Sequence, residues 1–203
     1  MSDITAPDLI LASTSRYRAD LLRRLRVPFT QRAPDVDETR RNGESPVELA
    51  LRLAAEKAAV VARLARGAWV IGSDQVCMLG DEALGKPGSH AAAIGQLQRL
   101  SGRQAVFHTA VCVIAPDGAQ QVRNCPTEVE FRSLGLQEIE AYLRLDTPYD
   151  CAGSAKSEAL GPALLKRMRS DDPTALVGLP LIDLCDMLRH SGFDVLARAH
   201  PSA

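Results

Sequence analysis

The chain has few aromatic residues and no long run of apolar residues. Phenylalanine, tryptophan and tyrosine make up only 4% of the 203 residues, too few for the stacking platforms of single-stranded nucleic-acid binders. The formal net charge of -1 also argues against a basic nucleic-acid-binding surface. No segment has the apolar length of a membrane span, and the first residues lack the pattern of a secretion signal. We therefore expect a cytoplasmic protein without nucleic-acid or membrane partners.

Cysteine and histidine lack the spacing of metal or redox sites. The five cysteines are widely separated and form no C-x-x-C pair, so we expect reduced thiols, mostly in the core. A catalytic cysteine is the alternative. The four histidines show no zinc-ligand spacing. A length of 203 residues with 46% hydrophobic residues fits one domain over residues 1–203, with its core at about 9–195 and room for two lobes.

Apolar periodicity and turn residues predict alternating strands and helices. The helix that starts at Pro46 is the best defined, because Ser45 and Glu48 form a capping box around a proline at the first helical position. Residues 34–45 and the glycine-punctuated residues 150–161 are predicted to be loops. Strands are predicted at 9–12, up to residue 74, at 106–114 and at 122–131, and helices at 16–26, 46–66, 90–100, 135–143 and 180–190.

The stretch from Ile71 to Gln75 carries the clearest functional signal. An apolar run ends at Ile71, and we interpret Gly72 and Ser73 as a turn that ends a buried strand and presents the carboxylate of Asp74. Ligands of open α/β sheets bind at the carboxyl ends of strands. An acid in this place can bind a metal ion or activate water.

Two cations lie where helices can hold an anion. Ser13 and the two hydroxyl residues after it precede a helix, so they form either an anion site with backbone N–H groups or an ordinary N-cap. Arg18, one turn into that helix, assists such a site or remains a surface charge. Lys57 shares a helix face with apolar residues, so it either extends to solvent or meets an anion. That face is defined by Leu49, Leu53, Val60 and Leu64.

Two further lysines lie in glycine-containing loops. Gly85-Lys86-Pro87 resembles the end of a Walker A loop, but Pro87 replaces the hydroxyl residue that would hold magnesium, so we reject that interpretation. Lys86 remains a candidate anion ligand. Lys156 and Glu158 lie among small residues, in a loop that either admits a ligand closely or is only a surface loop.

Acidic residues precede the helix that starts at Pro46. Asp35, Asp37 and Glu38 are either a solvated loop or, together with Asp74, a metal site, because hard cations take carboxylate oxygens.

The order of these motifs resembles the Maf family of nucleotide pyrophosphatases over about residues 9–195. Tyr17, Gln75 and the Cys-Ala-Gly-Ser loop resemble the subfamily that acts on 7-methyl-GTP more than the one that acts on dTTP and UTP. Two positions depart from the family pattern: Arg16 replaces a usual proline and Ala155 replaces a common aromatic residue. The matching motifs are Leu-Ala-Ser13-Thr-Ser15-x-Tyr17-Arg18, Val36-Asp37-Glu38, Arg52-Leu-Ala-x-Glu-Lys57-Ala, Ile-Gly-Ser-Asp74-Gln75-Val, Gly85-Lys86-Pro87, Phe131-Arg132, Cys-Ala-Gly-Ser-x-Lys156-Ser-Glu158, Asp172-Pro173 and Val177-Gly178-Leu179-Pro180-Leu181.

The resemblance implies a Maf/ITPase-like α/β fold, with a central mixed β-sheet, flanking helices and a substrate cleft between two lobes. It implies hydrolysis of 7-methyl-GTP to 7-methyl-GMP and diphosphate with Mg²⁺ or Mn²⁺, which keeps modified nucleotides out of nucleic acids, and it suggests a homodimer. Asp74 carries over as the general base or activator of a metal-bound water, and Glu38 as its metal-binding partner. Phosphate binding carries over to Ser13, Arg18, Lys57, Lys86 and Lys156, and base specificity to Tyr17, Gln75 and Glu158.

Two other functions remain open from the sequence. One is a dTTP or UTP pyrophosphatase of the same family. The other is a non-catalytic nucleotide-binding regulator of cell division, against which the presence of Asp74 together with all the cations argues.

Overall fold

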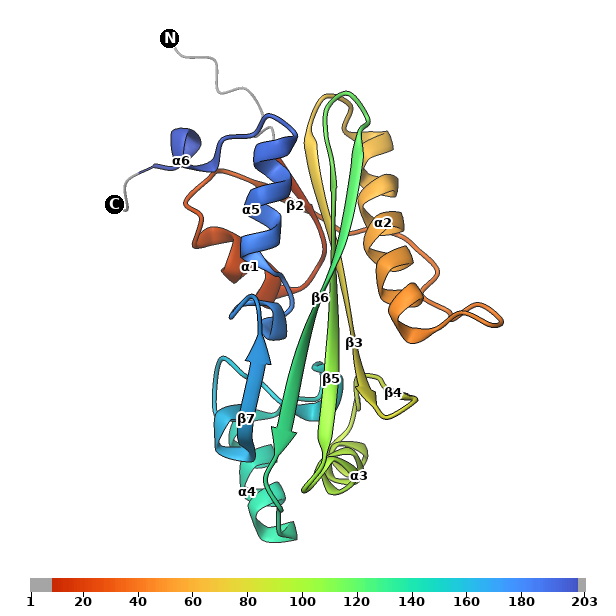
Figure 1. Cartoon of the computed structure of the whole chain (residues 1–203), viewed down its shortest axis with the longest axis vertical. Helices are drawn as coiled ribbons and strands as arrows, with labels where there is room; N and C mark the ends of the chain where they lie inside the picture. Colours follow the sequence, from red (N-terminus) through yellow and green to blue (C-terminus); the bar gives the residue numbers. More distant parts are fainter. Residues whose placement is uncertain (1–8, 201–203) are drawn as a thin grey trace.

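A mixed β-sheet runs along the computed structural model, which describes residues 9–200 (Figure 1). The strand order is β2-β1-β3-β5-β6-β7, and β4 pairs with β3. β1 (Leu9–Ala12) is parallel to β2 (Thr30–Arg32) and to β3 (Trp69–Leu79). All other pairings are antiparallel, and they involve β4 (Glu82–Leu84), β5 (Gln104–Ile114), β6 (Gln120–Phe131) and β7 (Leu165–Ser170). The prediction of a central mixed sheet with flanking helices is confirmed.

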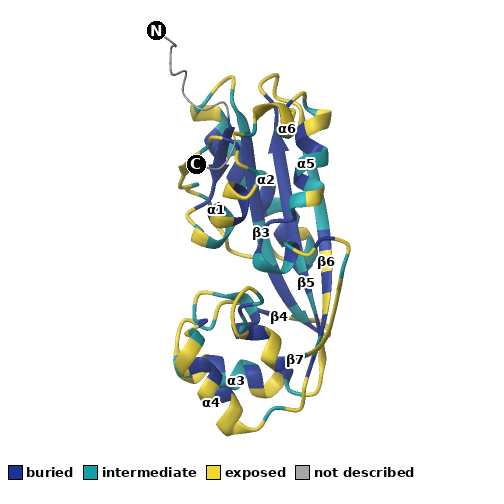
Figure 2. Ribbon diagram, turned by 90° about the vertical axis from the view of Figure 1, so that its left-hand side faces the viewer, coloured by how far each residue is buried: buried dark blue, intermediate teal, exposed yellow. Residues whose placement is uncertain are grey.

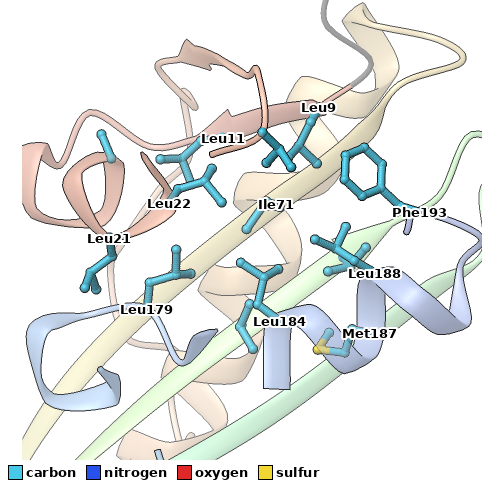
Figure 3. Packing of buried hydrophobic residues seen from close by; sticks show 14 residues of the cluster. Leu9, Leu11, Leu21, Leu22, Ile71, Leu179, Leu184, Met187, Leu188 and Phe193 are labelled. Carbon is cyan, nitrogen blue, oxygen red and sulfur yellow. The ribbon is translucent and has the colours of Figure 1, made fainter. Parts of the chain in front are cut away.

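Helices cover both faces of the first half of the sheet. α1 (Arg16–Arg23) and α5 (Leu181–His190) lie on one face, and α2 (Pro46–Leu64) lies on the other (Figure 1). Because strand side chains alternate, Leu9 and Leu11 enter the core with α1 and α5, whereas Ile10 and Ala12 enter the core with α2. Figure 3 shows the first of these cores, where leucines of α1 and α5 meet across Ile71. The short α6 (Val195–Arg198) follows α5.

The N-terminus of α2 is formed as predicted, but only part of the predicted face is buried: Leu53 and Lys57 are buried, and Leu49 and Val60 are half-buried. The capping box of Ser45 and Glu48 is present with Pro46 at the helix start. Leu64, expected on the buried face, is 72% exposed. The buried stripe consists largely of small residues, which let the helix lie close to the sheet: Ala50, Leu53, Ala54, Lys57, Ala58 and Val61.

β3 continues through Asp74, so the prediction that the strand ends there is wrong. Gly72 makes no turn. A Cβ atom at residue 72 would lie 2.1 Å from the carbonyl oxygen of Ala54, so this glycine is required by the close packing of α2 on β3. The break in the apolar pattern at Gly72 therefore marks the place where α2 contacts β3, and not the end of the strand.

The other half of the molecule has a separate core. α3 (His90–Leu100) and α4 (Leu136–Asp146) pack there with the distal parts of the long strands, and Figure 2 shows this second lobe below the first. Short 3₁₀ turns, Ala152–Ser154 and Gly161–Leu164, shape the loop after α4. β7 was not predicted because its exposed sequence Leu-Lys-Arg-Met-Arg-Ser has no apolar alternation. Across residues 9–200, none of the helices combines the length and apolar character needed to cross a membrane.

Candidate active site

Two adjoining cavities lie between the lobes, with volumes of ≈ 310 Å³ and ≈ 380 Å³. They are lined by α1, the loop before α2, α2 and β3 on one side, and by the loops after β4 and after α4 on the other. This cleft collects every residue predicted for the site except Lys156. Residues shared by both cavities are Ser15, Tyr17, Arg18, Glu38, Lys57, Lys86 and Asp150.

The cleft lies where one edge of β3 changes its partner strand. β1 pairs with β3 as far as Gly72, and β4 pairs with it from Cys77 onwards. Between these positions, no described strand occupies this edge, and Asp74 and Gln75 lie in the interval. The strand whose carboxyl end opens into the cleft is thus β1, which leads to Ser13 and the start of α1. Successive side chains of β3 point to opposite faces, so Asp74 faces α2 and Gln75 faces away from it.

Lys57 joins the two carboxylates of the site. Its Nζ lies 2.7 Å from Oδ1 of Asp74 and 2.6 Å from Oε1 of Glu38. The lysine side chain is only 7% exposed and that of Asp74 13%, whereas Glu38 is 60% exposed at the mouth of the cleft. Of the two alternatives for Lys57, contact with an anion is confirmed, and the anions are protein carboxylates.

Local charges hold Glu38 in its ionised form. Burial alone would raise the pKa of Glu38, but the hydrogen bond from Lys57 and the charges of Lys57, Lys86 and Arg18 outweigh it and lower the pKa. Glu38 is therefore a carboxylate at neutral pH, the form in which its oxygens could bind a cation.

The pair Glu38 and Asp74 could hold a hard divalent cation. Both carboxylates converge on one cationic atom, Nζ of Lys57, at 2.6 and 2.7 Å. Within residues 9–200 no group of three or more histidine, cysteine, aspartate or glutamate side chains could hold a metal, and Asp35 and Asp37 do not line the cleft. One or two carboxylates completed by phosphate oxygens and water is the usual arrangement for Mg²⁺.

The start of α1 holds hydroxyl and guanidinium groups together. Ser15 is the N-cap, and its Oγ accepts a hydrogen bond from the backbone N of Arg18 at 3.4 Å. Ser13 Oγ accepts from the backbone N of Ser15 at 3.1 Å and from Nη1 of Arg18 at 3.5 Å. Nε of Arg18 donates to the carbonyl of Gly178 at 2.9 Å, which fixes the guanidinium at the cleft wall. Burial lowers the pKa of Arg18, while Asp74 and Glu38 oppose this effect.

Gln75 lies on the opposite side of β3 and holds a loop. Its Nε2 donates to Oγ1 of Thr109 at 2.9 Å and to the carbonyls of Ala175 and Leu176 at 3.1 and 3.0 Å. Leu176 lines the cleft. Gln75 thus fixes the position of this apolar wall while its own side chain also reaches the cleft.

The remaining predicted residues lie around the mouth of the cleft. Lys86 and Glu158 are exposed and line it from the second lobe, opposite the half-buried Tyr17. Lys156 is buried, and its Nζ donates to the carbonyls of Asp146 and Thr147 at the end of α4. It lies 6.0 Å from the ring centroid of Tyr17, so its ammonium is near the cleft but is engaged by the helix terminus.

Sequence reasoning missed Asp150, which lines both cavities. Its Oδ1 accepts a hydrogen bond from the hydroxyl of Tyr17 at 3.3 Å. The two residues are 133 positions apart in the chain, so no local pattern could have joined them. The only available signal was the position of Asp150 at the start of the glycine-punctuated loop.

The alternative of a catalytic cysteine gains no support from the site. All five are free, and Cys77, Cys112 and Cys125 are buried. Cys151 lines the cleft, but burial, together with the charge of Asp150, raises its pKa to about 12. The prediction that most of the thiols lie in the core is confirmed.

Known proteins are similar to this chain over most of its length. A protein of Cupriavidus metallidurans named 7-methyl-GTP pyrophosphatase is 56% identical over 194 residues, covering 95% of this chain and 98% of that protein. One of Thiobacillus denitrificans with the same name is 57% identical over 193 residues, covering 95% and 96%. A solved nucleoside-triphosphatase / dITP/XTP pyrophosphatase of Mycobacterium abscessus aligns with 91% of this chain and 93% of its own at 17% identity, but the TM-score of 0.43 is too low to establish a shared fold. The family model described as Maf-like protein matches residues 8–191, and this chain therefore belongs to the Maf family.

Proposed function

We propose that this chain is a nucleoside triphosphate pyrophosphatase that hydrolyses 7-methyl-GTP to 7-methyl-GMP and diphosphate. The observation that carries the proposal is the arrangement of Asp74, Lys57 and Glu38 in a cleft that Arg18 and Lys86 also line. Relatives at 56% and 57% identity carry the name 7-methyl-GTP pyrophosphatase, which supports the choice of substrate.

The triphosphate would lie at the side of the cleft formed by α1 and α2. Backbone N–H groups at the start of α1 favour an anion there. The cations Arg18, Lys57 and Lys86 would neutralise the phosphate oxygens, which is the main catalytic requirement of phosphoryl transfer. A divalent cation held by Glu38 and Asp74 would supply further charge neutralisation at the same oxygens.

In this proposal, Asp74 would act as the base toward water. Lys57 contacts its Oδ1, so Oδ2 can accept the proton of an attacking water molecule. Water adds across the anhydride between the α- and β-phosphates, and diphosphate leaves.

The methylated base would lie toward Tyr17 and Glu158. N7-methylation gives the guanine ring a positive charge, and such a ring gains from an aromatic face and from a nearby carboxylate. Burial, as the largest effect, raises the pKa of Tyr17 to about 12, so the phenol is neutral and adds no charge of its own. A neutral pyrimidine would gain less from both groups.

The test is release of diphosphate from 7-methyl-GTP, GTP, UTP and dTTP with Mg²⁺ or Mn²⁺. We expect 7-methyl-GTP to be preferred, and Asp74→Asn to lower kcat by roughly 10²–10⁴-fold while nucleotide binding and Tm are retained. Preference for UTP or dTTP would assign the pyrimidine activity instead. Absence of release from all four nucleotides would leave a nucleotide-binding regulator as the function.

A further inference from the structure

Asp150 and Arg16 form a small charged unit on Tyr17 at the mouth of the cleft. The hydroxyl of Tyr17 donates to Oδ1 of Asp150 at 3.3 Å, and Nη2 of Arg16 lies 4.0 Å from Oδ2 of the same carboxylate. All three residues line the second cavity. Asp150 is 53% exposed and Arg16 is 69% exposed, so both can exchange partners without opening the core.

Arg16 also contacts the aromatic ring itself. Its Cζ lies 4.7 Å from the ring centroid of Tyr17, and its Nη2 donates to the Tyr17 hydroxyl at 2.7 Å. The guanidinium is a planar cation with delocalised charge that stacks on aromatic faces and pairs with carboxylates. An N7-methylated guanine ring has the same properties: it is planar, its positive charge is delocalised, and N–H groups lie along one edge. The Tyr17–Asp150 pair therefore already binds a group with the chemistry of the proposed base.

The distribution of charge along the cleft agrees with this comparison. The cations Arg18, Lys57 and Lys86 lie with Glu38 and Asp74 in the part assigned to phosphates and metal. Around Tyr17, the carboxylates Asp150 and Glu158 line the wall. The two cations nearest the ring already have partners: Arg16 contacts Asp150, and Lys156 donates to carbonyls at the end of α4. A cationic base gains from two carboxylates there, whereas a neutral guanine gains much less.

We propose that Asp150 is a further specificity-determining residue, whose carboxylate selects a positively charged purine over the neutral one. This inference rests on the proposed function. Tyr17 holds this carboxylate beside the stacking face through its hydroxyl. Arg16, which replaces the proline usual in the family, competes with the base for the same ring and carboxylate.

The experiment measures binding apart from turnover. Isothermal titration gives Kd values of 7-methyl-GMP and GMP for the unaltered chain, Asp150→Asn and Arg16→Gln. Asparagine keeps an oxygen acceptor for the Tyr17 hydroxyl and removes only the charge. Asp117→Asn, in the turn between β5 and β6 where Asp117 accepts a backbone hydrogen bond at 2.8 Å, controls for the change in net charge.

We expect the unaltered chain to prefer 7-methyl-GMP, and Asp150→Asn to reduce that preference about three- to tenfold, as for a partly exposed charge pair. Arg16→Gln is expected to tighten 7-methyl-GMP binding more than GMP binding, and Asp117→Asn to change neither.

An unaltered preference in Asp150→Asn, an equal loss for both nucleotides, or no initial preference would each overturn the role of Asp150. The proposed function fails on different evidence, namely the absence of diphosphate release from any triphosphate.

Discussion

At residue 72 the absence of a side chain lets α2 lie directly on β3. The nearest atoms to a Cβ at this position would be backbone atoms, the carbonyl oxygen of Ala54 at 2.1 Å and the N of Ala58 at 2.8 Å. Backbone atoms in a helix cannot rotate aside as a flexible side chain does. Lys57 lies between these two alanines in the sequence, so the spacing of helix and strand also sets its distance to Asp74.

We expect Gly72→Ala to destabilise the protein by about 1–3 kcal/mol through overpacking, and to lower activity by moving Lys57 away from Asp74. Chemical denaturation and kcat of the variant measure the two effects. Gly95→Ala is the matched control, because a Cβ added at Gly95 in α3 would have nothing within 4 Å and alanine favours a helix by up to about 1 kcal/mol. Equal stability of the two variants would contradict this account of Gly72.

At the scale of elements, Arg52 in α2 holds the loop before this helix in place. Nε and Nη2 of Arg52 lie 2.6 and 3.0 Å from the two carboxylate oxygens of Glu44, and Nη2 also donates to the carbonyl of Thr39 at 3.0 Å. The side chains of Arg52 and Glu44 are 12% and 9% exposed. Because Thr39 follows Glu38, this two-point contact fixes the backbone that presents Glu38 to Lys57.

Lowering the pH should weaken the contact between Glu44 and Arg52 within a defined pH range. The hydrogen bond from Arg52, together with one from the backbone of Arg41, lowers the pKa of Glu44 to about 2 from 4.5. A lowered carboxylate pKa stabilises the fold above about 4.5, and this contribution is lost as the pH falls toward about 2. We expect Glu44→Gln to lose stability at pH 7 and to show a smaller further loss than the unaltered chain between about pH 4.5 and about pH 2, measured by urea denaturation.

The control is Arg41→Gln, which removes the pair of Arg41 with Glu56 at 2.8 Å. That arginine is 66% exposed, so its removal should have little effect on stability. Parallel stability curves for Glu44→Gln and the unaltered chain across the acid range would refute the role of Glu44.

Elements marked by local chemistry are predictable from the sequence, and those defined by distant contacts are not. The capping box at Ser45 and the turn at Asp117 use neighbouring residues, and both α2 and the β5–β6 hairpin are predicted correctly. The predicted end of β3 comes too early, because the close contact with α2 requires Gly72 within a strand. The same limit applies to the site: Asp74, Lys57 and Glu38 stand out from local patterns and match the family motifs, whereas Asp150 contacts Tyr17 only through the fold.

At the scale of the whole molecule, the cleft is formed by two lobes with separate cores. The core with α1 and α5 and the core with α2 belong to the first lobe, and the core with α3 and α4 belongs to the second. β3, β5 and β6 are shared by both (Figures 1 and 2). Tyr17 and Asp150 contact each other across the cleft.

A nucleotide that contacts both lobes should protect both from hydrogen exchange. With saturating 7-methyl-GTP and Mg²⁺ added to Asp74→Asn to prevent turnover, we expect slower exchange in residues 13–18 and in residues 150–158. A ligand at about 100 times its Kd stabilises the fold by about 2.7 kcal/mol, and opening reactions that release the ligand should slow by the corresponding factor of about 100. Diphosphate alone is the control and should protect mainly residues 13–18. Protection of one segment only by the whole nucleotide would show that it does not bridge the lobes.

Because β3 runs without interruption through both lobes, it restricts which residues of the enzyme can be replaced without loss of the fold. The strand residues around Asp74 are fixed by pairing with β5 and by contact with α2, so substitutions that alter their packing disturb folding and hydrolysis together. In the loop at 150–158, Gly153, Ser154 and Lys156 are buried, whereas Asp150 and Glu158 are exposed and face the cleft. Directed evolution toward a different base should therefore accumulate substitutions in that loop and at residue 16, and leave the strands unchanged.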